Sequence, residues 1–195
     1  MGNMSELMEQ VRHRVSVDDY YKMAAAGIFG ANDRVELING EIVDMAPAGS
    51  RHASLVTRLN QLFSRSLASD VIVKVQDPLH LDAESEPEPD LMLLKARQDF
   101  YAKAHPEAQD VLLLVEVGDS TARFDREIKL PLYARHRIAE VWLIDVETCR
   151  VEVCRAPLAD GSDYAERTIV SSGMIAPRAF PAASVEVGTL FPWRA

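Results

Sequence analysis

One apolar segment, residues 111–117, constrains the fold of this chain more than any other feature. It reads Val-Leu-Leu-Leu-Val-Glu-Val, and Glu116 is its one polar residue. A continuous apolar run of this length is typical of a β-strand that is buried on both faces of a sheet. Such a strand needs a packed layer on each side. The sequence therefore predicts an α/β or α+β fold in which helices flank a mixed sheet.

The surrounding patterns predict further helices and strands. Helices are expected over residues 16–26, 50–68, 99–104 and 125–137, the last kinked by Pro131. Strands are expected over residues 71–76, 89–94, 141–146, 150–155 and 164–170, and Asn39-Gly40 predicts the turn of a hairpin over 34–45. Residues 1–15 are polar, so we expect a flexible N-terminal segment before a single domain over residues 16–195.

Composition excludes several classes of protein. The chain has 195 residues, 48% of them hydrophobic, and a formal net charge of −9, which is an ordinary globular composition. There is no apolar run of membrane-spanning length and no signal-peptide pattern, so we expect a cytoplasmic protein without membrane contact. Two cysteines are too few for a disulfide scaffold or a closed zinc site. The acidic balance argues against nucleic-acid binding by bulk charge alone.

Glu116 is the first candidate for chemistry. A carboxylate in a buried strand costs several kcal/mol unless it is paired or binds a metal ion. Strand alternation places Gly118 on the same face, where it leaves space beside the carboxylate. The alternative is that Glu116 lies at the end of the strand and reaches water.

A run of five acids over residues 82–90 supplies the second candidate. The first four are expected in a solvated loop. Asp90 differs, because it follows Pro89 and leads directly into an apolar segment, where it can meet Glu116 on a neighbouring strand. Two carboxylates held together need a cation or a shared proton. Because these are hard oxygen ligands, the sequence predicts Mg²⁺ or Mn²⁺ rather than zinc.

A basic segment, residues 123–137, follows Glu116 and holds five basic and two acidic residues. Ordinary ion pairs along a helix face would explain it if it stood alone. Its position favours a second interpretation, in which Lys129 reaches the carboxylate site. Tyr133 lies one helical turn further, where it either packs in the core or contacts a phosphate or base.

Two other polar residues, Glu36 and His52, are further candidates. Glu36 occurs in the first strand of the predicted hairpin, where it would face solvent if the strand alternates in the usual way. His52 falls in the first turn of its helix, where a surface or capping role is the simpler interpretation.

The order of these residues resembles the Uma-type restriction endonuclease family, which belongs to the PD-(D/E)XK nuclease superfamily. The resemblance covers roughly residues 16–190, and it depends on the order and spacing of short motifs. These motifs are Arg34-Val-Glu-Leu-Ile-Asn-Gly-Glu-Ile-Val, His52, Glu88-Pro-Asp90-Leu, Val115-Glu-Val, Ser120-Thr, Asp125-Arg, Lys129, Tyr133-Ala and Glu140-Val-Trp-Leu-Ile-Asp. It implies a restriction-endonuclease-like core with a mixed sheet of four or five strands.

The resemblance also implies roles for single residues. Asp90 and Glu116 correspond to the metal-binding acids, and Glu36 to an auxiliary acid earlier in the chain. The usual lysine lies two residues after the second acid, where this chain has Gly118. The resemblance implies that Lys129, on the next helix, takes its place.

His52, Arg126 and Tyr133 are candidate substrate-binding residues. The function implied is a Mg²⁺- or Mn²⁺-dependent endonuclease that hydrolyses phosphodiester bonds of nucleic acid, most readily DNA, and a homodimer would suit cleavage of two strands. Two alternatives stay open. One is an inactive binding or regulatory module with a nuclease fold, and the other is a phosphohydrolase acting on a smaller substrate.

Overall fold

The computed structural model describes residues 12–30, 32–67 and 70–194, and these form two compact units. The smaller unit comprises the described residues up to Met45 together with Leu81–Pro87, and the larger comprises Ala46–His80 and the described residues from Glu88 onward. The single domain expected over residues 16–195 stays a prediction. Most of the flexible segment expected over residues 1–15 lies outside the described residues. Val15, which lies within them, donates its N–H to the Gly40 carbonyl at 2.9 Å.

The smaller unit is built from a helix and a hairpin. Helix α2 (Val17–Ala25) begins where the Ser16 side chain accepts the N–H of Asp19, as serine commonly does at a helix N-cap. Strands β1 (Val35–Ile38) and β2 (Glu41–Asp44) pair antiparallel. The turn residues between them, Asn39 and Gly40, both have positive φ. This is the geometry of the predicted Asn-Gly turn.

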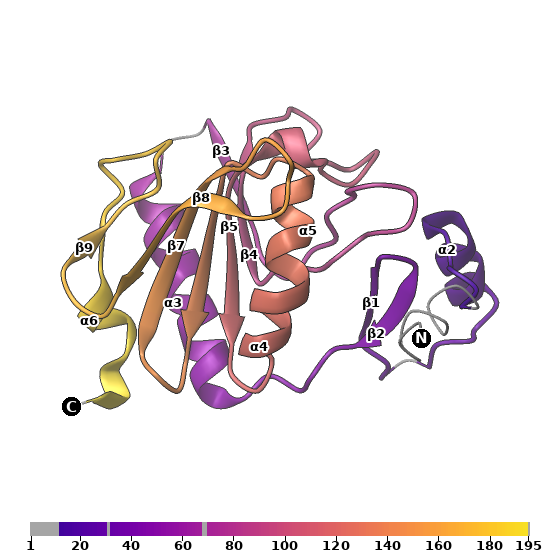
Figure 1. Cartoon of the computed structure of the whole chain (residues 1–195), viewed down its shortest axis with the longest axis horizontal. Coiled ribbons are helices and arrows are strands. Elements are labelled where there is room, and N and C mark those ends of the chain that lie inside the picture. Colours follow the sequence, from indigo (N-terminus) through magenta and orange to yellow (C-terminus); the bar gives the residue numbers. More distant parts are fainter. Residues whose placement is uncertain (1–11, 31, 68–69, 195) are drawn as a thin grey trace, which may run out of the picture. The chain divides into compact units, whose positions relative to one another are not determined.

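The larger unit contains a six-stranded mixed sheet in the order β3-β4-β5-β6-β7-β8 (Figure 1). Its strands are β3 (Val71–Lys74), β4 (Leu91–Lys95), β5 (Val111–Gly118), β6 (Glu140–Asp145), β7 (Arg150–Pro157) and β8 (Tyr164–Val170). Strands β5 and β6 are parallel, and every other neighbouring pair is antiparallel. The predicted fold class and the predicted central strand are confirmed, although six strands form where four or five were expected.

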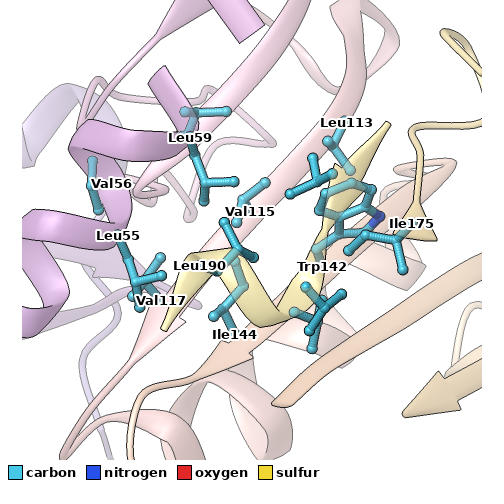
Figure 2. Close-up of a cluster of buried hydrophobic side chains, with 14 of the residues drawn as sticks. Leu55, Val56, Leu59, Leu113, Val115, Val117, Trp142, Ile144, Ile175 and Leu190 are labelled. Carbon is cyan, nitrogen blue, oxygen red and sulfur yellow. The ribbon is translucent and has the colours of Figure 1, made fainter. Parts of the chain in front are cut away.

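One face of this sheet packs against helix α3 (Ser50–Ser66) and the C-terminal segment. Leu55 and Leu59 of α3 meet Val115 of β5 in the core that Figure 2 shows. The C-terminal segment consists of β9 (Met174–Ile175), β10 (Val185–Glu186), α6 (Val187–Leu190) and η3 (Pro192–Arg194). Leu190 of α6 joins the same core. The odd-numbered residues of β5 therefore face α3, and Glu116 points to the opposite face.

The opposite face carries a helix in three parts. These are α4 (Ala122–Phe124), the π-helical turn η2 (Asp125–Lys129) and α5 (Leu130–Arg135). The sequence predicts one helix over residues 125–137 with a kink at Pro131. Instead, Pro131 lies in the first turn of α5, and the Leu130 N–H bonds to the Asp125 carbonyl five residues back. Proline lacks the N–H that would continue the α-helical ladder, so the extra residue is accommodated as a π-bulge.

Two other local predictions are wrong. Residues 99–104 form turns instead of a helix, because Phe100 and Tyr101 both adopt positive φ. The next helical element is the 3-10 turn η1 (Ala108–Asp110). Serine favours the N-cap position, so Ser50 is predicted to cap α3, but the N-cap is Gly49 and Ser50 is the first helical residue.

None of the helices among the described residues 12–30, 32–67 and 70–194 combines the length and the hydropathy that a membrane crossing requires. The longest, α3, has 17 residues.

Gly118 permits the close approach of α4 to β5, which generates a stability prediction. A Cβ built on Gly118 would lie 2.6 Å from the Cα of Ala122, so the backbone would have to shift. Gly118→Ala is expected to lower the free energy of unfolding by about 1–3 kcal/mol, measured by urea denaturation. Gly188→Ala is the control, since its Cβ would meet only the Glu186 side chain at 3.6 Å. Equal stability of the two variants would contradict this packing argument.

Candidate active site

Two acids lie side by side on the central strands of the sheet. Asp90 immediately precedes β4, and Glu116 lies in β5, which pairs antiparallel with β4. The Asp90 N–H donates to Glu116 Oε2 at 3.4 Å, and Asp90 Oδ2 accepts the N–H of Val117 at 2.8 Å. Their residues are 9% and 3% exposed. The alternative in which Glu116 reaches water is therefore wrong, and the two acids meet as their positions in the sequence suggest.

The second oxygen of Asp90 is held by two polar side chains from other elements. His52, in the first turn of α3, places Nε2 at 3.0 Å from Asp90 Oδ1. Gln76 donates its side-chain amide to the same oxygen at 3.2 Å and its backbone N–H to the Asp90 carbonyl at 3.3 Å. His52 is thus part of the site and not a surface cap. Gln76 was not predicted as a site residue, because a single amide after a strand has no distinctive sequence pattern.

Glu116 Oε1 is bound from the opposite layer by the helix that follows β5. Lys129 Nζ lies 3.3 Å from this oxygen, and the Tyr133 hydroxyl donates to it at 2.5 Å. Lys129 is 5% exposed and Tyr133 is fully buried. The two side chains are four residues apart, so they lie on the same side of the helix. The position two residues after Glu116 is Gly118, and a lysine from the helix reaches the acid instead.

The π-helical turn η2 lines a small cavity beside Glu116. Asp125 is buried at its start and accepts a hydrogen bond from the Thr121 hydroxyl at 3.0 Å. A small cavity of about 10 Å³ is lined by Glu116, Gly118, Asp125 and Arg126, among others. That volume holds about one water molecule. The sequence places Asp125 in a basic segment and in the Asp125-Arg motif but predicts no role for it, since an acid at the start of a helix usually caps it.

Arg126 and Glu36 complete the list of predicted site residues. Arg126 lines the cavity next to Glu116, and its Nε donates to Glu152 of β7 at 3.1 Å. Glu36 belongs to the smaller unit, where it is buried in β1 and does not face solvent. Glu86 of the same unit is also buried and accepts a hydrogen bond from the Tyr21 hydroxyl. The prediction of a solvated loop is therefore wrong for Glu86, because residues 81–87 pack along β1.

The carboxylate oxygens of Asp90 and Glu116 suit a hard divalent cation that is held by few protein ligands. Within residues 12–30, 32–67 and 70–194, no group of three or more His, Cys, Asp or Glu side chains is arranged to hold a metal ion. Asp90 and Glu116 contribute two carboxylates, and each oxygen has two lone pairs, so the hydrogen bonds above leave capacity for a cation. Mg²⁺ commonly binds through one or two carboxylates and keeps several waters. The pair therefore fits Mg²⁺ or Mn²⁺.

Thiol chemistry does not fit this protein. Both cysteines are buried and free. Burial raises the pKa of the Cys154 thiol to about 12, because the charged thiolate is disfavoured away from water.

A mixed sheet between helices, with paired acids at its central strands and a lysine supplied by the adjoining helix, defines the class of nuclease-like α/β proteins. A family model described as "Putative restriction endonuclease", the Uma2 family, matches residues 17–188, and the chain belongs to this family. A similar fold occurs in a protein from Anabaena variabilis ATCC 29413 described as "a putative nuclease belonging to DUF820". The two share 14% identity at a TM-score of 0.73, over 93% of this chain and 99% of the other. No curated protein matches the chain in sequence.

The buried pair of Lys129 and Glu116 yields a prediction about stability. Lys129→Met leaves the Glu116 carboxylate buried without its cation, so we expect a loss of about 3–5 kcal/mol in the free energy of unfolding. The double variant Lys129→Met/Glu116→Gln removes both charges and is expected to recover at least about 1 kcal/mol of that loss. The measurement is urea denaturation at neutral pH.

The control for this cycle is Lys103→Met, which removes an exposed lysine from the same unit and should leave stability within about 0.5 kcal/mol of wild type. Strict additivity of the two site substitutions would mean that Lys129 and Glu116 do not interact.

Proposed function

We propose that this protein is a metal-dependent endonuclease that hydrolyses phosphodiester bonds of nucleic acid, with DNA as its substrate. The observation that carries the proposal is the buried pair of Asp90 and Glu116, with Lys129 hydrogen-bonded to Glu116. Membership of the Uma2 family supports the same chemistry. Bound Mg²⁺ or Mn²⁺ would lower the pKa of water and neutralise negative charge on the phosphate.

In this proposal, Asp90 and Glu116 hold the cation through their carboxylate oxygens. Lys129 orients the attacking water or stabilises the additional negative charge of the transition state. Its position 3.3 Å from Glu116 Oε1 keeps the ammonium group at the site, and Tyr133 fixes the same oxygen from the next helical turn. His52 and Gln76 orient Asp90 in the same way.

Two further assignments belong to the proposal. Glu36 serves as the auxiliary acid that the family resemblance implies. Tyr133, His52 and Arg126 contact the substrate or position the groups that do. We also propose a cytoplasmic homodimer, because two-fold symmetry would present one site to each strand of a duplex.

An inactive module with the same fold is the main rival. A buried charged pair often stabilises a fold no better than hydrophobic residues of similar volume would. The presence of Asp90, Glu116 and Lys129 in one hydrogen-bonded group therefore favours an active site over a purely structural role. A phosphohydrolase of small substrates would use the same acids, and it is separated from a nuclease by the length of substrate that it binds.

Cleavage assays test the proposed chemistry. Wild-type protein is expected to cleave plasmid or single-stranded DNA with Mg²⁺ or Mn²⁺ and to lose activity in a chelator. Asp90→Asn and Glu116→Gln should each abolish cleavage, and Lys129→Ala should lower the rate by roughly 10²–10³-fold. Lys103→Ala is the matched control and should cleave as wild type does. If Lys129→Ala also cleaves at the wild-type rate, the role given to Lys129 is wrong.

Metal binding is tested apart from activity. Calorimetric titration with Mn²⁺ is expected to show binding to the wild type and a loss of at least tenfold in affinity for Asp90→Asn, because a principal oxygen ligand is removed. Asp70→Asn changes an exposed carboxylate of the same unit and serves as the control. Binding that is equally strong in all three proteins would place the cation elsewhere.

A further inference from the structure

A second cavity continues from the carboxylate site across the face of the sheet. Its volume is about 130 Å³, and its lining includes Arg126, Leu143, Asp145, Thr148 and Arg150. Arg126, Leu143 and Asp145 also line the small cavity next to Glu116. The two cavities therefore lie side by side on the sheet, and the surface from Glu116 to the second cavity is termed the path.

The register of the sheet gives the direction of this path. Glu116 of β5 pairs with Leu143 of β6, which pairs with Glu152 of β7, which pairs with Ile169 of β8. These residues form one row across the face that carries α4 and α5 (Figure 1). Neighbouring strands lie about 4.8 Å apart, so β7 is about 10 Å from Glu116. At about 3.4 Å of helix rise per phosphate, this distance covers two or three phosphates of one strand.

Arginine side chains line the path, and one of them is held in place. Glu152 is buried and accepts hydrogen bonds from Arg126 at 3.1 Å and from Arg167 of β8 at 2.6 Å. Two cations thus share one carboxylate. Arg126 uses only Nε in its bond to Glu152, and its two terminal nitrogens carry four more N–H groups that suit a phosphate.

Arg167 remains a cation in this setting. Burial disfavours its charge, but the hydrogen bonds to Glu152 and Asp163 outweigh this effect and raise the pKa of its guanidinium above the ordinary value. Arg167 therefore compensates Glu152 as well, while Arg126 stays on Glu152 through Nε and keeps its terminal nitrogens for a ligand.

Arg150 adds a second arginine farther along the path. It begins β7, is exposed, and pairs in register with Asp145 of β6. Within the described residues 12–30, 32–67 and 70–194, its guanidinium makes no hydrogen bond or ion pair. Asp145 Oδ1 accepts the N–H of Thr148 at 2.8 Å. An arginine beside a cavity that no carboxylate of the described chain engages is suited to bind an external anion.

We propose that this cavity binds backbone phosphates of a polynucleotide next to the bond being cleaved, through Arg150 and Arg126, with Glu152 positioning Arg126. The inference rests on the proposed nuclease function and adds to it a subsite for backbone phosphates beside the bond that is cleaved. A small ester at Glu116 would leave Arg150, about 10 Å away, without a role. A strand with several phosphates spans both cavities.

The salt dependence of binding tests this inference directly. Binding of a labelled 12-nucleotide single strand to the full chain is followed by fluorescence anisotropy at several salt concentrations, with Ca²⁺ in place of Mg²⁺. Each phosphate contact contributes about 0.7 to the slope of log K against log salt for a single strand. Arg150→Ala is expected to weaken binding about 3–10-fold at low salt and to reduce the slope by about 0.7. Arg150→Lys, which keeps the charge, should retain the slope.

Arg123→Ala is the matched control. Arg123 lies in α4, one turn before Arg126. Its side chain is 86% exposed and pairs with Glu127 at 2.9 Å. Its removal changes the net charge by the same amount as Arg150→Ala but should leave the slope unchanged. Equal effects of the two variants, no effect of Arg150→Ala, or no binding of the oligonucleotide to the wild type would each overturn the inference.

Hydrolysis of bis(p-nitrophenyl) phosphate by the wild type separates this inference from the proposed function. If the ester is hydrolysed in a metal-dependent way while Arg150→Ala leaves the slope unchanged, the phosphate path is wrong and the catalytic proposal stands. If neither the ester nor DNA is cleaved while the slope still depends on Arg150, the protein binds polynucleotides without cleaving them, and the catalytic proposal fails.

Discussion

The carboxylate of Glu116 is the constraint on which the arrangement of the larger unit depends. It sits in β5, where every residue but Leu112 is buried, and an uncompensated charge there would cost several kcal/mol. Lys129 and Tyr133 supply the compensation from the following helix, and the Asp90 backbone supplies it from the neighbouring strand. The return of the chain after β5 is thereby fixed. Gly118 lets α4 approach the strand, and the π-bulge at η2 precedes the helix that carries Tyr133.

This arrangement explains how much of the site the sequence could predict. The continuous apolar run predicted β5, and the one acid inside that run made Glu116 a candidate, because both signals are local. The pairing of Asp90 with Glu116 followed from two acids at the ends of neighbouring apolar strands. Gln76 could not be predicted. It adopts a positive φ just after β3 where it contacts Asp90, and no residue pattern in the sequence indicates this conformation. Glu152 was missed because its partners, Arg126 and Arg167, come from distant elements.

Turn chemistry and helix geometry account for the local errors. Asn39-Gly40 was predictive because positive φ suits these two residues at a hairpin turn. Phe100 and Tyr101 adopt positive φ without such a signal, so the helix expected there does not form. Pro131 correctly predicted an irregularity in the helix after β5, but sequence alone does not decide between a kink and a π-bulge. The net charge of −9 is likewise uninformative about the cavity beside β7, where two arginines and two carboxylates line the wall and Arg167 adds a third cation on Glu152.

The central claim is that Asp90 and Glu116 form a cation site that Lys129 and Tyr133 hold in shape. The most direct measurement is a crystal structure of the protein soaked in Mn²⁺, with the ion located by its anomalous scattering. The account predicts manganese within bonding distance of oxygens of both carboxylates, about 2.0–2.2 Å as is usual for hard divalent cations of this size. The absence of manganese there at high concentration, with Lys129 still on Glu116, would contradict it.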